Sequence, residues 1–62
     1  MVKVYGDDGK MLFQSVSLKW AMRRIVKRHD RSCFINIVGH GPMVLAEVYS
    51  DSLDCTYVIE DC

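Results

Sequence analysis

One stretch of this sequence carries apolar side chains at the spacing of an α-helix, and the segments on either side of it do not. Within it six side chains suited to a helix face recur at intervals of three and four: Leu18, Ala21, Met22, Ile25, Val26 and His29. An α-helix turns once in about 3.6 residues, so these positions form one continuous stripe. Ser17 precedes the stripe and is a residue type that caps helix N-termini. We therefore predict one helix, from about Leu18 to His29, capped by Ser17.

The segments before the helix predict a β-hairpin. VKVY (2–5) and KMLFQSV (10–16) alternate in polarity and are separated by GDDG, in which glycine accepts the positive φ of a tight turn. A two-residue loop divides their side chains into two faces. One face comprises Val2, Val4, Met11 and Phe13, and the other Lys3, Tyr5, Leu12 and Gln14.

The segments after the helix predict a second hairpin and a final strand. CFINIV (33–38) and MVLAEVYS (43–50) flank the turn signal GHGP. A four-residue connection makes one face of Cys33, Ile35, Ile37, Val44, Ala46 and Val48. CTYVIE (55–60) predicts a last strand of undetermined register. The predicted fold is a single α+β domain over residues 1–62: a ββαββ(β) antiparallel sheet with one amphipathic helix packed on one face.

The size of the chain limits its function. A chain of 62 residues buries only about 60% of its unfolded surface and has little room for a desolvated cleft. No apolar run approaches the roughly 20 residues of a membrane span, and MVKVYGDDGK lacks a secretory apolar stretch, so we expect a cytoplasmic protein that does not contact a membrane. The cysteines Cys33, Cys55 and Cys62 are odd in number, which favours reduced thiols over a disulfide framework.

The zero net charge conceals two oppositely charged halves. Residues 1–31 contain all eight Lys and Arg residues against three Asp residues, a balance of +5. Residues 32–62 contain five acidic residues and no Lys or Arg, a balance of −5. Such asymmetry indicates a charged partner or pairing between the halves.

Catalytic and cofactor signals are weak. The histidines and cysteines have no CxxC, HxxxH or HxxE spacing, and GHGP lacks the GK[ST] of a phosphate loop. His40 is a candidate base, but no spacing places it beside a thiol. We expect a protein that is not an enzyme, with no metal and no cofactor.

The helix itself carries the strongest binding signal. At about 100° per residue, Trp20 lies about 200° from Leu18, almost opposite the apolar stripe. An exposed tryptophan among arginines is typical of a binding hot spot. The predicted partner-binding residues are the anchor Trp20, four cations around it and two at the rim: Arg23, Arg24, Lys27, Arg28, Lys19 and Arg31.

Three kinds of partner fit such a face. An acidic protein surface would pair with the arginines and bury the indole, which is our leading hypothesis. Nucleic acid would pair with the cations and stack its bases on the indole, although a pI near 6.7 is low for a dedicated nucleic-acid domain. The chain's own acidic half, within one molecule or across a dimer, is the third.

The other face of the predicted sheet is unusually apolar. Six side chains point away from the helix in the expected register: Tyr5, Leu12, Phe34, Val38, Met43 and Leu45. Either the last strand or the chain end covers part of this face, or the protein forms a homodimer through it.

The middle of the chain resembles a known kind of protein. The 26 residues FQSVSLKWAMRRIVKRHDRSCFINIV run from a strand through a Ser-x-Ser-Leu-x-x-Ala helix start and a basic helix to a β-branched strand. This layout resembles small phage-encoded inhibitors of host machinery, including some anti-CRISPR proteins and the T7-type RNA polymerase inhibitor. The resemblance implies a protein that acts by occupying a surface and contributes no individual site residues.

Overall fold

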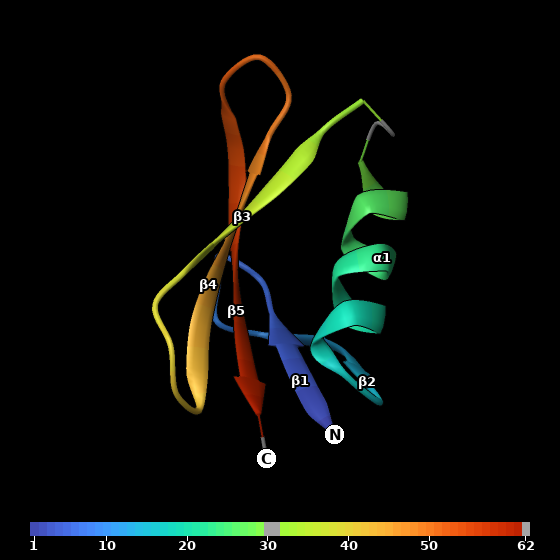
Figure 1. Ribbon diagram of the computed structural model, residues 1–62, viewed down its shortest axis with the longest axis vertical. Coiled ribbons are helices and arrows are strands. Elements are labelled where there is room, and N and C mark those ends of the chain that lie inside the picture. The colour runs from blue at the N-terminus through green and yellow to red at the C-terminus, as the bar shows by residue number, and fades with distance from the viewer. Residues whose placement is uncertain (30–31, 62) are drawn as a thin grey trace.

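The fold is a five-stranded antiparallel sheet with one helix, as Figure 1 shows. The computed structural model describes residues 1–29 and 32–61. Its elements in chain order are β1 (Val2–Tyr5), β2 (Met11–Ser15), α1 (Leu18–Arg28), β3 (Phe34–Val38), β4 (Met43–Tyr49) and β5 (Leu53–Asp61). The predicted α+β fold and its order of elements are therefore confirmed.

The last strand lies in the middle of the sheet. The strand order is β2-β1-β5-β4-β3, so β5 pairs with β1 on one side and with β4 on the other. Its pairing places Val2 opposite Asp61 and Val4 opposite Ile59. The two hairpins are thus joined into one sheet only through β5, whose position the sequence pattern left open.

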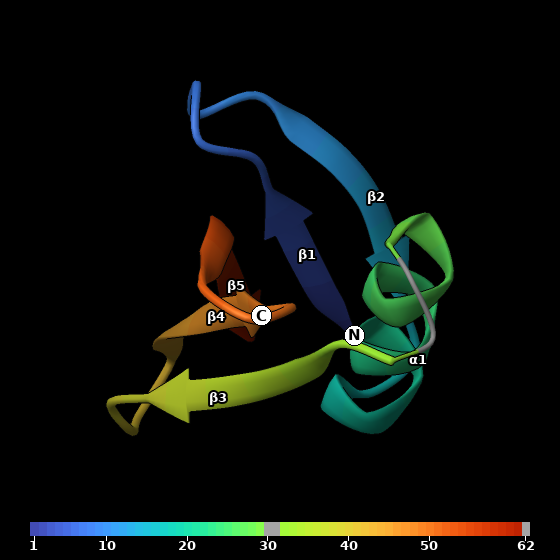
Figure 2. The ribbon, with the colours of Figure 1, turned by 90° about the horizontal axis from the view of Figure 1, so that it is seen from above.

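The helix packs between the two edges of the sheet. Seen from above, the sheet curls so that its edge strands, β2 and β3, approach α1 from either side (Figure 2), and α1 contacts β1, β2 and β3. The core lies between the sheet and the helix. Its buried side chains are Val2, Val4, Ala21, Ile25, Cys33, Ala46, Val48, Tyr57 and Ile59.

The second hairpin has the expected faces, but its pairing is shifted by two residues from that of a four-residue connection, because Val38 lies opposite Leu45 and not Met43. Ile35 pairs with Val48 and Ile37 with Ala46, so the predicted face of small and β-branched residues does point toward the helix. The strand begins at Phe34, one residue later than predicted. Cys33 nevertheless lies in the core, as a small buried apolar side chain.

The first hairpin differs from the prediction in its turn and therefore in its faces. The Gly9 N–H donates to the Gly6 carbonyl (3.1 Å), the Gly6 N–H donates to the Lys10 carbonyl (3.0 Å), and Gly9 has φ +81°. Glycine at this positive φ produces the extra bulge residue that a two-residue turn lacks. The loop is consequently longer than expected, and the pairing shifts between Val4 and Tyr5.

The bulge exchanges two predicted side-chain positions. Met11, not Leu12, pairs with Tyr5, and Met11 is half exposed instead of buried. Leu12 lines a depression together with Arg28 of the helix and Tyr57 of the core. The predictions of a core Met11 and of a Leu12 on the helix-free face are therefore wrong.

The helix begins where expected and ends one residue early. The Ser17 hydroxyl accepts a hydrogen bond from the Trp20 backbone N–H (3.4 Å), so the predicted cap is confirmed. His29 has left the helical conformation and caps the C-terminus through its own N–H, which donates to the Val26 carbonyl. Lys27 and Arg28 occupy the last turn, where cations interact favourably with the helix dipole.

Candidate binding surfaces

Trp20 lies on the solvent side of α1, as the helical wheel predicts. Ala21 and Ile25 are fully buried on the opposite side, whereas 49% of the Trp20 side chain is exposed. The Arg23 guanidinium carbon lies 5.0 Å from the centroid of the indole ring, a cation–π contact. A half-exposed indole beside a cation is therefore a real feature of this surface.

The cations around Trp20 differ in how the fold uses them. The Arg24 guanidinium lies 4.3 Å from the centroid of the Phe13 ring and donates to the Gln14 carbonyl (3.5 Å), so it also helps to attach the helix to β2. Lys19 and Lys27 are exposed on either side of Arg23 in the sequence. We call these residues the Trp20 face: Lys19, Trp20, Arg23, Arg24 and Lys27.

Two predicted cations do not belong to this face in the same way. Arg28 is exposed, but it interacts with the hydroxyl of Tyr57, a core residue of β5. On the wheel Arg28 lies next to the buried Ala21, which explains this contact. Arg31 lies outside the residues that the structure describes.

The helix-free face of the sheet is exposed as far as the described residues extend. β5 lies within the sheet and does not cover it, so the alternative in which the last strand shields this face is wrong. Five large apolar side chains are between 41% and 62% exposed there. We call this surface the outer sheet face: Phe34, Val38, Met43, Leu45 and Leu53, with the half-buried Tyr5, Tyr49 and Val58 in the same rows.

The outer sheet face carries a hollow with an acidic residue beside it. Val38, Met43, Leu45 and Val58 line an almost wholly apolar depression of about 380 Å³. Glu47 lies in the adjacent row, where it accepts hydrogen bonds from the Asn36 side-chain amide (3.2 Å) and the Tyr49 hydroxyl (3.4 Å).

A polar cluster that the sequence did not predict joins the end of α1 to β5. The His29 Nε2 atom lies 2.7 Å from the Tyr57 hydroxyl and 3.4 Å from the Cys55 Sγ atom. Burial raises the pKa of Tyr57, the Cys55 thiol raises this pKa further, and Arg28 partly offsets both effects. The cluster depends on the register of β5, and no local spacing connects these residues.

The Cys55–His29 pair has the separation of a nucleophile and its base. However, one imidazole nitrogen makes only one good hydrogen bond within the ring plane. The Tyr57 hydroxyl already holds Nε2 at the shorter distance. The geometry therefore favours a structural role, in which these hydrogen bonds attach the end of α1 to β5, over an activated thiol.

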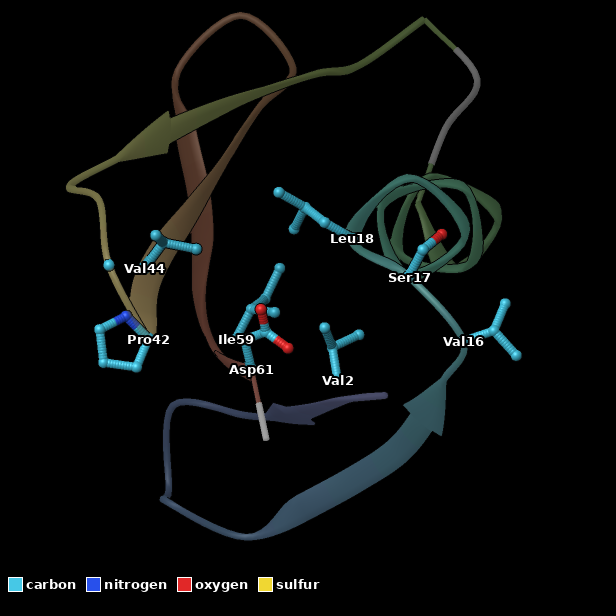
Figure 3. Close-up of a pocket in the computed structure, with 9 residues that line it drawn as sticks. Val2, Val16, Ser17, Leu18, Pro42, Val44, Ile59 and Asp61 are labelled. Atoms are coloured by element: carbon cyan, nitrogen blue, oxygen red, sulfur yellow. The ribbon is translucent and has the colours of Figure 1, made fainter.

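A cavity opens into the core beside the first turn of α1. It measures about 280 Å³ and lies where Val2, Leu18, Val44 and Ile59 converge (Figure 3). Leu18 belongs to the predicted core stripe but stays 37% exposed because it borders this opening. The cavity is at the lower limit of ligand-pocket size, and its Ser17 hydroxyl is already engaged as the helix cap.

His40, the candidate base of the sequence analysis, is exposed in the turn between β3 and β4. In residues 1–29 and 32–61, no three His, Cys, Asp or Glu side chains gather closely enough to hold a metal ion. None of the described helical residues form a helix of the length and apolarity that a membrane crossing requires. Comparison with known protein families, curated proteins and solved structures finds no match for this chain.

Proposed function

We propose that this protein is a non-enzymatic binding protein of the cytoplasm, encoded by a phage or mobile element, that inhibits or regulates a protein partner. It acts by occupying an acidic or nucleic-acid-facing surface of that partner with the Trp20 face. One observation carries the proposal: Trp20 is 49% exposed although the core side of α1 is complete without it.

The chemistry of the face supports a protein partner. Leaving an indole in water forgoes about 1.5–3 kcal/mol of burial free energy that a core position would provide. A partner surface recovers this free energy when it covers the ring, and tryptophan and arginine dominate measured interface hot spots. Arg23, stacked on the ring, is held in position to meet a carboxylate of the partner.

The test compares capture by the wild-type protein with capture by a double variant, Trp20→Ala with Arg23→Ala. Both side chains are exposed, so the variant keeps its fold, which circular dichroism verifies. We expect at least about a thirtyfold loss of affinity for the captured partner, the equivalent of a hot spot of about 2 kcal/mol. Lys10→Glu, in the β1–β2 turn, is the matched control and retains binding.

Nuclease treatment separates this proposal from the alternative, a nucleic-acid-binding module that uses the same face. A nucleic-acid module shifts arbitrary oligonucleotides at about 50 mM salt, where phosphate contacts are strongest. It also loses its captured material after nuclease treatment. Either result, or full binding by the double variant, contradicts the proposed protein partner.

A further inference from the structure

The outer sheet face has the properties that the Trp20 face requires of a partner. Its exposed fractions are 62% for Phe34, 53% for Met43 and 51% for Leu53, so several large apolar side chains of this face are open to solvent. A polar row divides this face at Asn36 and Glu47, and beyond it Val38, Met43 and Leu45 form one apolar cluster. Clusters of exposed apolar side chains mark interaction sites. The depression beside Met43 is concave and apolar, as an indole requires.

The charges of the outer sheet face are acidic. Glu47 and Glu60 point to this side of the sheet, and the Tyr5 hydroxyl donates to Glu60 (3.2 Å). In the outer rows of the five described strands, Lys3 is the single cation, and it pairs across the strands with Glu60. The Trp20 face carries four cations and no acid.

The two faces lie on opposite sides of the molecule. Figures 1 and 2 place α1 on one side and the β4–β5 part of the sheet on the other. One copy cannot bring its own helix face to its own outer sheet face. A second copy can.

We propose that the Trp20 face of one copy binds the outer sheet face of a second copy of this chain. The indole enters the depression lined by Val38, Met43 and Leu45, and the helix cations meet Glu47 and Glu60. This inference rests on the proposed binding role of the Trp20 face and names a partner for it. Self-association then competes with the target for Trp20 and limits the active concentration of the protein.

Charge favours this head-to-tail arrangement over a symmetric dimer. A face-to-face dimer through the outer sheet faces would bury the Glu47 and Glu60 carboxylates of both copies with only Lys3 to balance them. Buried carboxylates without cations carry a large desolvation cost. The head-to-tail contact instead supplies arginines and lysines, and because it is heterologous, it continues from copy to copy without closing.

Two variants that each lose one face test the proposal. The helix variant is Trp20→Ala with Arg23→Ala, and the sheet variant is Val38→Lys with Met43→Lys; all four side chains are exposed. Analytical ultracentrifugation over micromolar to millimolar concentrations gives the mass of each. We expect the wild-type mass to grow beyond a dimer, and each variant alone to stay monomeric.

The mixture of the two variants is the decisive sample. Each variant retains the face that the other lacks, so an equimolar mixture forms a one-to-one dimer and nothing larger. High salt weakens this dimer because the contact pairs opposite charges. Lys10→Glu associates like the wild-type protein and serves as the control.

Three results would overturn the inference: a wild-type protein that stays monomeric throughout, a helix variant that still dimerises by itself, or a mixture that stays monomeric while the wild type associates. Each leaves the proposed function testable on its own. The sheet variant keeps an intact Trp20 face and should capture the target at least as well as the wild type does, because self-association no longer competes for Trp20. Failure of self-association and failure of target binding are thus separate outcomes.

Discussion

At the scale of single residues, Tyr57 connects the core to the end of the helix. Its ring is 7% exposed, and its hydroxyl meets His29 at 2.7 Å. Replacing it by phenylalanine keeps the ring and removes the hydrogen bond. We expect Tyr57→Phe to lower the free energy of unfolding by about 1 kcal/mol near neutral pH, since a part-buried partner, His29, loses its bond.

The same substitution changes the pH dependence of stability. Burial, followed by the Cys55 thiol, raises the pKa of Tyr57 above its unfolded value of about 10. Between those two pKa values the folded state keeps a proton that the unfolded state has lost. The stability that Tyr57 contributes is therefore complete below about pH 10 and falls as the pH rises, by up to about 1.4 kcal/mol per pH unit.

Urea denaturation at a series of pH values from about 8 to 11 measures this effect. The wild-type free energy of unfolding should fall more steeply above about pH 10 than that of Tyr57→Phe. The lysines titrate in the same range but are identical in both proteins, so the difference between the slopes belongs to Tyr57. Equal slopes would show that the Tyr57 hydroxyl titrates as it does in the unfolded chain.

At the scale of elements, the helix depends on one fully buried side chain. Ile25 is 0% exposed and packs in the core formed with β1, β4 and β5. Ile25→Ala removes buried methyl and methylene groups and leaves a cavity, at a cost of about 2–5 kcal/mol. For a domain of this size that is most of the stability. Lys27→Ala, exposed on the same helix, should change the stability by no more than about 0.5 kcal/mol.

Urea titrations followed by far-ultraviolet circular dichroism compare the two variants with the wild type. If Ile25→Ala unfolded at the same midpoint as Lys27→Ala, the helix would not be packed on the sheet as described. The difference in stability between the two variants also supports the tests of the Trp20 face. It shows which side of α1 stabilises the fold and which side can be substituted without unfolding the protein.

How far the sequence predicted these elements depends on whether the signal was local. The helix stripe, the Ser17 cap and the two faces of the β3–β4 hairpin follow from periodicity and capping, and all are present. The β3–β4 pairing itself is shifted by two residues from the one that a four-residue connection gives. The exposure of Trp20 follows from the same wheel. The binding roles assigned to it and its neighbours stay predictions.

Other features carried no usable local signal. The bulge in the first hairpin exchanges Met11 and Leu12, which are equally apolar, so hydrophobic pattern cannot distinguish the two registers. β5 pairs with β1 between residues as far apart as Val2 and Asp61. The cluster of His29, Cys55 and Tyr57 exists only once that pairing is made, and for this reason spacing rules could not find it.

At the scale of the whole molecule, the fold turns a division of charge along the chain into a division in space. The Cα positions extend over 31 × 20 × 18 Å. The Debye length is about 8 Å at physiological ionic strength, so the basic helix side and the acidic sheet side are largely screened from each other. Each side therefore interacts with a partner almost independently. The local charge of the side that a partner approaches, and not the zero net charge, determines the electrostatic attraction.

The whole-molecule topology also makes a prediction about connectivity. β1 and β5 are neighbours in the sheet, with Val2 opposite Asp61, so the first and last described residues are close together. Both strands are interior: β1 lies between β2 and β5, and β5 lies between β1 and β4. The sheet therefore requires the β1–β5 pairing, whichever strand comes first in the chain. The turn between β3 and β4, residues 39–42, is exposed throughout. Exposed turns are where new chain ends are best tolerated.

We therefore expect a circular permutant to fold. Its original ends are joined by a short Gly/Ser linker, and it is opened between His40 and Gly41. The linker shortens the longest loop that folding must close, the one that brings β1 to β5, whose cost grows with loop length. The permutant should show the wild-type circular dichroism spectrum and unfold cooperatively in urea. Deletion of residues 53–62 is the negative control. It removes β5, the strand that joins the two hairpins, and should leave an unfolded chain. A permutant that fails to fold, or a truncated chain that unfolds cooperatively, would contradict the central position of β5 on which both binding faces depend.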